Sequence, residues 1–158
     1  MSALYTGTVT TIGETMARSV TDSNAFKIFM DEPEALGGRN GAPSPLDFIL
    51  AAHGGCLNYM IFFIANEMGI SIEKTEITVT GKLDPAKFVG TDMNGRAGYQ
   101  EIDVQICLTS EASDEEIARL KTAVEQRCPV SDNLTHATPV SISMTTRSTH
   151  YMERCDSE

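Results

Sequence analysis

The longest apolar segment of the chain runs from Leu46 to about Met68, and its apolar residues fall on every side of an α-helix. This pattern predicts a helix that is buried nearly all round. Gly69 is suited to end it. Gly54 and Gly55 interrupt the segment near its centre, where glycine costs helix stability relative to alanine. We therefore expect another backbone to pack closely against the helix at this pair.

Capping boxes mark the beginnings of two helices. Ser44 fits the N-cap of the apolar helix, Pro45 its first position, and Asp47 the carboxylate position. A second box, Ser113 with Glu116, opens a shorter helix that has one apolar stripe and stops at Cys128-Pro129.

Alternation of apolar and polar residues predicts strands elsewhere in the chain. Apolar residues alternate most clearly around Ile77, from Ile102 to Leu108, and from Val140 to Met144. Weaker strand signals precede a glycine- and proline-rich loop over residues 31–43, which we expect to hold no regular structure. These weaker signals cover Tyr5–Thr11, Thr15–Thr21 and Phe26–Met30.

The order of these elements indicates an α+β fold, not the regular alternation of a parallel-sheet protein. With 158 residues, the chain corresponds to one domain, 1–158. We divide it into N-terminal strands and loop (1–43), a central helix (44–68), a strand pair with second helix and last strand (69–146), and a polar tail (147–158).

Charge and cysteine count narrow the function classes. The net charge is −10, with no cluster of Lys or Arg, which argues against nucleic acid and anionic membranes as partners. The apolar helix contains Asp47, His53 and Asn58, so we interpret it as a core helix and not a membrane span. The N-terminus lacks a signal-peptide pattern, and we expect a cytoplasmic protein. No CxxC pair is present, and we expect neither a metal nor a cofactor.

The four cysteines differ in their predicted surroundings. Cys56 lies in mid-helix, where a reactive thiolate needs a nearby cation and the alternative is an inert core thiol. Cys128 lies at a helix C-terminus, where the negative dipole end disfavours a primary nucleophile but allows a resolving role. Cys107 is on the polar face of a strand, and Cys155 lies among acidic residues.

His53 shares a helix face with Cys56, which leaves open a Cys–His hydrolase dyad or a hydrogen-bonded core histidine. No Asn or Asp is positioned to orient the imidazole, which favours the core histidine.

Two motifs carry a resemblance to a known family. The first is Ser44-Pro45-Leu46-Asp47-Phe48-Ile49-Leu50-Ala51-Ala52-His53-Gly54-Gly55-Cys56, and the second is Arg127-Cys128-Pro129-Val130-Ser131. Together with the order of elements, they resemble the OsmC/Ohr family of thiol peroxidases over nearly the whole chain. The resemblance implies an OsmC-like fold, with two antiparallel sheets wrapped around two long central helices in an intertwined homodimer.

The resemblance also implies a reaction. Cys56 would reduce an organic hydroperoxide and become a sulfenic acid, Cys128 would resolve it as a disulfide, and a dithiol such as a lipoyl protein would regenerate the thiols. Family members place an arginine beside the thiolate, held by a glutamate. Asp47 falls where the family has that glutamate, and Arg39 is the first candidate for the arginine, with Arg18 second.

Two functions remain open at this point. The leading hypothesis is the peroxidase, with Cys56, Cys128, Arg39 and Asp47 as its site. The alternative is a non-catalytic binding or redox-sensing homodimer of the same fold, which keeps the cysteines without an activating arginine. The pKa of Cys56 discriminates between them, since a value well below the ordinary one favours the enzyme.

Overall fold

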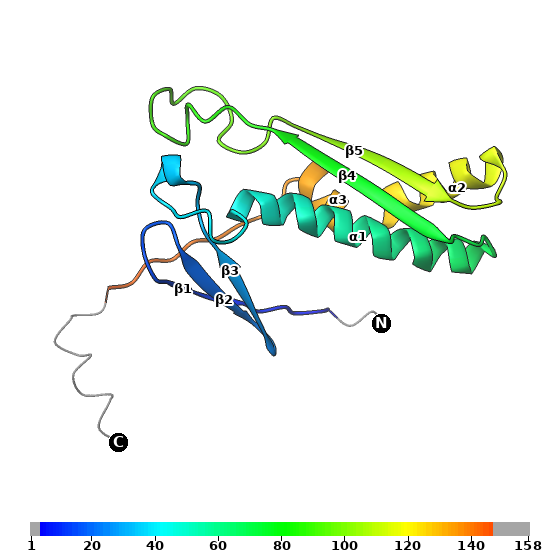
Figure 1. Cartoon of the computed structure of the whole chain (residues 1–158), viewed down its shortest axis with the longest axis horizontal. Helices are drawn as coiled ribbons and strands as arrows, with labels where there is room; N and C mark the ends of the chain where they lie inside the picture. Colours follow the sequence, from blue (N-terminus) through cyan, green and yellow to red (C-terminus); the bar gives the residue numbers. More distant parts are fainter. Residues whose placement is uncertain (1–3, 147–158) are drawn as a thin grey trace, which may run out of the picture.

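The computed structural model describes residues 4–146, in which a long central helix lies beside a two-stranded sheet and two shorter helices (Figure 1). A separate three-stranded sheet lies near the beginning of the long helix (Figure 1). The elements in chain order are β1 (Thr10–Gly13), β2 (Ser19–Ser23), β3 (Phe26–Met30), the short 3₁₀ helix η1 (Glu34–Leu36), α1 (Pro45–Met68), β4 (Lys74–Lys82), β5 (Glu101–Thr109), α2 (Asp114–Arg127) and α3 (Pro129–Thr135). The mixed α and β class predicted from the sequence is confirmed.

Both predicted capping boxes are present. Ser44 accepts a hydrogen bond from the Asp47 N–H, and the Asp47 carboxylate accepts one from the Ser44 N–H at 2.9 Å. Ser113 and Glu116 make the same reciprocal pair at the start of α2. Gly69 ends α1 in the left-handed region at φ 70°, where glycine carries no Cβ penalty. Local sequence therefore determines where both helices begin and where α1 ends.

The two sheets are antiparallel. In the first, β2 lies between β1 and β3, with Thr21 opposite both Thr11 and Ile28. In the second, β4 pairs with β5 along its whole length, from Lys74 opposite Thr109 to Lys82 opposite Glu101. The first sheet has no substantial contact with α1, α2, β4 or β5 within the described residues.

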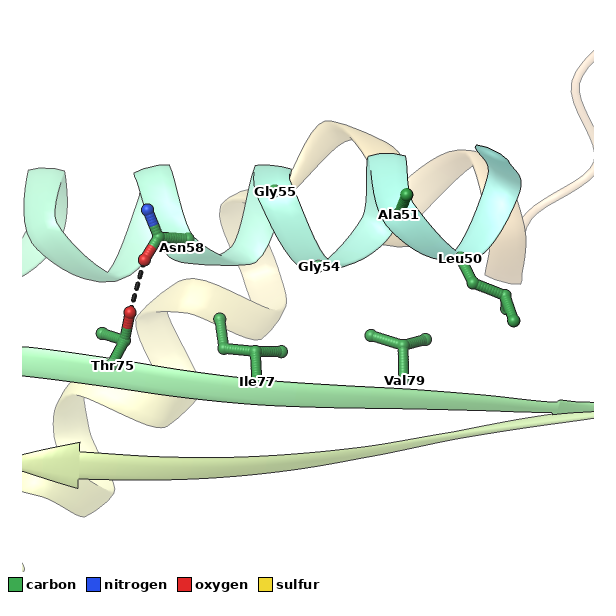
Figure 2. A pocket seen from close by; sticks show the side chains of 8 residues that line it. All are labelled: Leu50, Ala51, Gly54, Gly55, Asn58, Thr75, Ile77 and Val79. Carbon is green, nitrogen blue, oxygen red and sulfur yellow. Dashed lines mark hydrogen bonds between the residues drawn. The ribbon is translucent and has the colours of Figure 1, made fainter. Parts of the chain in front are cut away.

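The glycine pair of α1 has two different surroundings. Gly54 faces β4, and a Cβ at this position would lie 3.4 Å from a methyl group of Val79 (Figure 2). The neighbours at Gly54 are thus side-chain methyl groups of β4 at ordinary contact distance, and not the closely packed backbone that the sequence led us to expect. Gly55 is different, because a Cβ there would meet nothing within 4 Å among residues 4–146.

The hydrophobic core lies on one side of α1. It joins α1 to α2 and to the start of α3, and its most buried side chains are Ile64, Leu120 and Cys128, each 1% exposed. Its buried members are Leu57, Met60, Ile61, Ile64, Ala65, Ile70, Leu120, Val124 and Cys128.

The opposite side of α1 is not covered in the single chain, so the prediction of burial nearly all round is wrong at this level. Tyr59 is 63% exposed and Phe62 is 41% exposed. Within the described range, α1 is the one helix long and apolar enough to cross a membrane. Its contacts with α2, α3 and β4 are those of a core helix with one open face.

Four other predictions need correction. The expected last strand over Val140–Met144 is absent, because no strand between residues 4 and 146 pairs with it, and Ile142 is 83% exposed. The sequence analysis missed α3, since Cys128-Pro129 marks both an end and a new beginning. The loop 31–43 contains one short helical turn, η1. The first two strands begin later than predicted, whereas β3 matches its prediction. The tail 147–158 lies outside the described residues.

Candidate functional site

Cys56 and Cys128 meet although 72 residues separate them in the sequence. Cys56 projects from the middle of α1, and Cys128 lies at the junction of α2 and α3. Their sulfur atoms are 3.3 Å apart and both thiols are free. Cys128 is 1% exposed, whereas Cys56 is only partly buried. A molecule arriving from solvent therefore reaches the Cys56 sulfur first.

The surroundings of Cys128 differ from the sequence expectation. It is the C-cap of α2, as predicted, but it is also the N-cap of α3, and its sulfur accepts the Ser131 N–H at 3.5 Å. Burial raises the pKa of Cys128, but hydrogen bonds from the Ser131 hydroxyl and N–H and from Cys56 outweigh it and leave the pKa below the ordinary value. The hydrogen bonds at the start of α3 thus give a lowered pKa where the sequence led us to expect a raised one.

Cys56 has the opposite electrostatic position. Burial raises its pKa, and the Val130 N–H offsets this only in part. No arginine or lysine among residues 4–146 contributes to its pKa. Within one chain, the more accessible thiol is therefore the less acidic one.

The other predicted site residues are not brought to Cys56. Asp47 lies nine residues before Cys56 on α1, roughly 13 Å along the helix axis, and its carboxylate caps the helix. Arg39 is exposed in the loop before α1, and its N–H donates to the buried carboxylate of Asp31. Arg18 forms an ion pair with Glu14 at 2.6 Å and does not reach the cysteines.

Sequence reasoning missed Ser131 as a member of the site. Its hydroxyl lies 2.9 Å from Nε2 of His53, and its N–H faces the Cys128 sulfur. The signal was present in Cys128-Pro129-Val130-Ser131. Proline is common at the first position of a helix, and the side chain of the N-cap residue before it commonly accepts the N–H of the third helical residue, which here is Ser131.

Two cavities border α1, and neither is lined by the cysteines. A groove of about 370 Å³ lies between α1 and β4, with Gly54 and Gly55 on one wall and the Asn58–Thr75 hydrogen bond at one end (Figure 2). A larger cavity of about 900 Å³ lies between α1, α2 and β5, and His53 and Ser131 contribute to its lining.

The bulky residues that follow Cys56 are divided between the core and the surface of the single chain. Met60 belongs to the core, and Tyr59, Phe62 and Phe63 are exposed. Tyr59 and Phe63 stack with ring centroids 5.7 Å apart.

The remaining cysteines lie away from the pair or outside the described residues. Cys107 is exposed on β5 opposite Glu76, and Cys155 is beyond residue 146. No group of three His, Cys, Asp or Glu residues suited to a metal ion occurs between residues 4 and 146.

The chain is a two-cysteine α+β protein. One cysteine lies on a long helix, the second lies at the start of a later helix, and the strands form two antiparallel sheets. The family model described as OsmC-like protein matches residues 38–143, and the chain belongs to this family.

Solved structures agree on the fold. An OsmC-like protein from Mycoplasma pneumoniae matches with a TM-score of 0.72 and 23% identity, over 83% of this chain and 88% of the other. An organic hydroperoxide resistance protein OsmC from Legionella pneumophila matches with a TM-score of 0.63 and 24% identity, over 84% and 91%. An organic hydroperoxide resistance protein from Vibrio cholerae, with captopril bound in one of its active sites, matches with a TM-score of 0.62 and 22% identity, over 85% and 87%. No curated protein matches the chain.

Proposed function

We propose that the chain is a cytoplasmic thiol peroxidase that reduces organic hydroperoxides with Cys56 and Cys128. The observation that carries this proposal is the 3.3 Å separation of two free thiols from distant parts of the sequence. A sulfenic acid on one sulfur would lie within reach of the other without rearrangement of the fold.

Exposure supports Cys56 as the thiol that meets the hydroperoxide. The Cys56 thiolate attacks the terminal oxygen of R–O–OH, the S–O bond forms, and the O–O bond breaks. The alkoxide leaves and takes a proton to become the alcohol, while Cys56 is oxidised to a sulfenic acid. Cys128 is too buried to react with the hydroperoxide first, but its sulfur already contacts the Cys56 sulfur, which becomes oxidised.

In the second step, the Cys128 thiolate attacks the sulfenic sulfur. The S–S bond forms, the S–O bond breaks, and hydroxide leaves and is protonated to water. The lowered pKa of Cys128 suits this step, because thiolate is the attacking species. A dithiol, which a lipoyl protein could supply, then reduces the disulfide by thiol exchange and is itself oxidised.

The first step needs a cation that one chain does not place beside Cys56. We propose that a homodimer supplies it. The uncovered face of α1 and the isolated N-terminal sheet both favour a second copy of this chain as the missing cover. Arg39 is the first candidate, since its side chain makes no ion pair among the described residues, whereas Arg18 is already paired with Glu14. Asp47 would then orient that arginine in addition to capping α1.

One observation favours the alternative function. Burial raises the pKa of Cys56, which is the expected state of a thiol that is not activated. A non-catalytic OsmC-like homodimer that binds a ligand or senses oxidants would keep the same cysteine pair without a rapid reaction at Cys56.

Consumption of cumene hydroperoxide in the presence of a dithiol tests the proposal. We expect Cys56→Ser to abolish turnover, because a hydroxyl does not ionise at neutral pH. Cys128→Ser should react once and then over-oxidise at Cys56. Cys107→Ser is the matched control and should retain turnover, since Cys107 is exposed on β5. Absence of any hydroperoxide consumption by the native chain would leave the non-catalytic homodimer as the better account.

Substitution of the two arginines tests the source of the cation. We expect Arg39→Ala to slow the first step by raising the pKa of Cys56, whereas Arg18→Ala should have less effect. If only Arg18→Ala slows the reaction, the choice of arginine is wrong and the mechanism stands.

Peptide mapping without reductant tests the pairing itself. Mild oxidation should join Cys56 to Cys128 within one chain and leave Cys107 and Cys155 free. A dominant bridge to either of these two would contradict the assignment.

A further inference from the structure

His53 is a buried polar residue of α1 that the proposed peroxidase steps do not use. It lies one helical turn before Cys56 and is 8% exposed. Its Nε2 atom lies 2.9 Å from the hydroxyl oxygen of Ser131, which is on α3. Its Nδ1 atom is buried and has no hydrogen-bond partner among residues 4–146.

The unpartnered Nδ1 atom determines the direction of the His53–Ser131 hydrogen bond. Burial lowers the pKa of His53, so the imidazole is neutral and carries one proton. A proton on Nδ1 would leave a buried N–H without an acceptor, which is the more costly and rarer defect. The proton therefore belongs on Nε2, which donates to the Ser131 oxygen.

This hydrogen bond fixes the Ser131 side chain, which belongs to the first turn of α3. The N–H of the same residue donates to the Cys128 sulfur at 3.5 Å. A continuous series of contacts thus runs from α1 through α3 and back to α1. It passes from His53 to Ser131, from Ser131 to Cys128, and from Cys128 to Cys56 at 3.3 Å.

We propose that His53 is a positioning residue for Cys128: its Nε2–H holds the Ser131 side chain, and with it the first turn of α3, so that the Ser131 N–H stays on the Cys128 sulfur and stabilises the thiolate. The inference rests on the proposed function, which gives Cys128 the resolving role. In that role the Cys128 sulfur is oxidised as the S–S bond forms, the Cys56 sulfur is reduced as its S–O bond breaks, and the hydroxide is protonated to water. His53 does not transfer the proton in this account.

Titration of Cys128 as the sole thiol tests the inference directly. Cys56→Ala, Cys107→Ser and Cys155→Ser together leave Cys128 as the one cysteine of the four in the chain. The ultraviolet absorbance of the thiolate, followed against pH, then reports the Cys128 pKa. Arg127, the preceding residue, is ion-paired with Glu67 and keeps its charge throughout.

Two pairs of substitutions in this background separate position from packing. We expect Ser131→Ala and His53→Leu each to raise the Cys128 pKa by about one unit, the value of one hydrogen bond to a charged group. Ser131→Thr keeps the hydroxyl, and His53→Gln keeps a side-chain N–H donor without a titrating group, so both should retain most of the lowered pKa. Circular dichroism at each pH confirms that the variants are folded.

A second measurement uses the chain with all four cysteines present. The rate of disulfide formation with diamide at neutral pH should fall about tenfold in His53→Leu, in proportion to the lost thiolate, and little in His53→Gln. An unchanged pKa in Ser131→Ala, or a His53→Gln variant that behaves like His53→Leu, would overturn the inference.

Neither measurement uses a hydroperoxide. If the native chain fails to consume hydroperoxide while the titrations give the expected shifts, the proposed function fails and the positioning role of His53 stands.

Discussion

Replacement of Phe62 by glutamate is the sharpest test of the proposed homodimer. Phe62 lies on the uncovered side of α1, and its side chain is 41% exposed in the single chain. Residues at three- and four-residue intervals continue this face through Ala52, Gly55 and Tyr59. Gly55, where a Cβ would meet nothing within 4 Å, allows a second helix to approach closely. We expect this face to be buried against its own copy.

The exposed area sets the magnitude. An aromatic side chain buries roughly 200 Å², so the open 41% of Phe62 corresponds to about 80 Å². At about 25 cal/mol per Å², covering it contributes about 2 kcal/mol. A twofold interface contains the residue twice, which gives about 4 kcal/mol per dimer, or almost a thousandfold in the dissociation constant. Burial of a carboxylate adds to the loss.

Sedimentation velocity over a dilution series measures the effect. We expect the native chain to sediment as a dimer and Phe62→Glu as a monomer at the same concentration. The melting temperature of Phe62→Glu should also be lower, because dimerisation stabilises the folded chain. Phe62→Leu is the matched control and should remain dimeric. The reasoning is refuted if Phe62→Glu dimerises as tightly as the native chain, or if the native chain is a monomer with native circular dichroism.

Three further outcomes follow from other parts of the structure. Leu120→Ala, in the core of α2, should lower the free energy of unfolding by about 2–5 kcal/mol, measured by urea denaturation, whereas Ile142→Ala at an 83% exposed position should cost much less unless a second chain covers it. The Gly41 N–H lowers the pKa of Asp31 in the folded chain against the effect of burial. The ionised Asp31 therefore stabilises the fold above its unfolded-state pKa, and this contribution is lost as pH falls through its folded-state pKa. Asp31→Asn should remove this acid dependence in denaturation experiments between neutral and acidic pH. Burial lowers the pKa of His53 in the folded chain, so the His53 imidazole binds a proton more readily when the chain is unfolded. The free energy of unfolding should therefore decline as pH falls below about 6.5, and His53→Gln should flatten that decline in the same denaturation series.

The parts of the fold that local sequence controls were predictable. Ser44 and Ser113 mark their helix starts because a cap satisfies backbone groups within its own turn. The alternation from Ile102 to Leu108 identified β5 because its partner β4 is in the same chain. The same alternation over Val140–Met144 gave a wrong prediction, because a strand also needs a partner strand and no strand among residues 4–146 pairs with this segment.

The candidate site was predictable only in part for a related reason. Cys56 and Cys128 could be named from their motifs, and their contact follows from the packing of α3 on α1. The lowered pKa of Cys128 could not be foreseen while α3 was missing from the predicted elements, because the hydrogen bonds that lower it come from Ser131 and Val130 in the first turn of α3. Arg39 could not be placed, because its side chain is exposed in the loop before α1 and makes no ion pair among the described residues.

The two thiols differ in both solvent accessibility and pKa. Cys56 is accessible but its pKa is raised, whereas Cys128 is 1% exposed and its pKa is lowered by the hydrogen bonds of α3. A buried thiolate cannot meet a hydroperoxide, so the Cys128 thiolate becomes useful only after Cys56 has been oxidised beside it. The thiol with the lowered pKa is thus the shielded one, and the thiol with the raised pKa is the more accessible one. Activation of Cys56 by a cation from a second copy would then make the reaction depend on assembly.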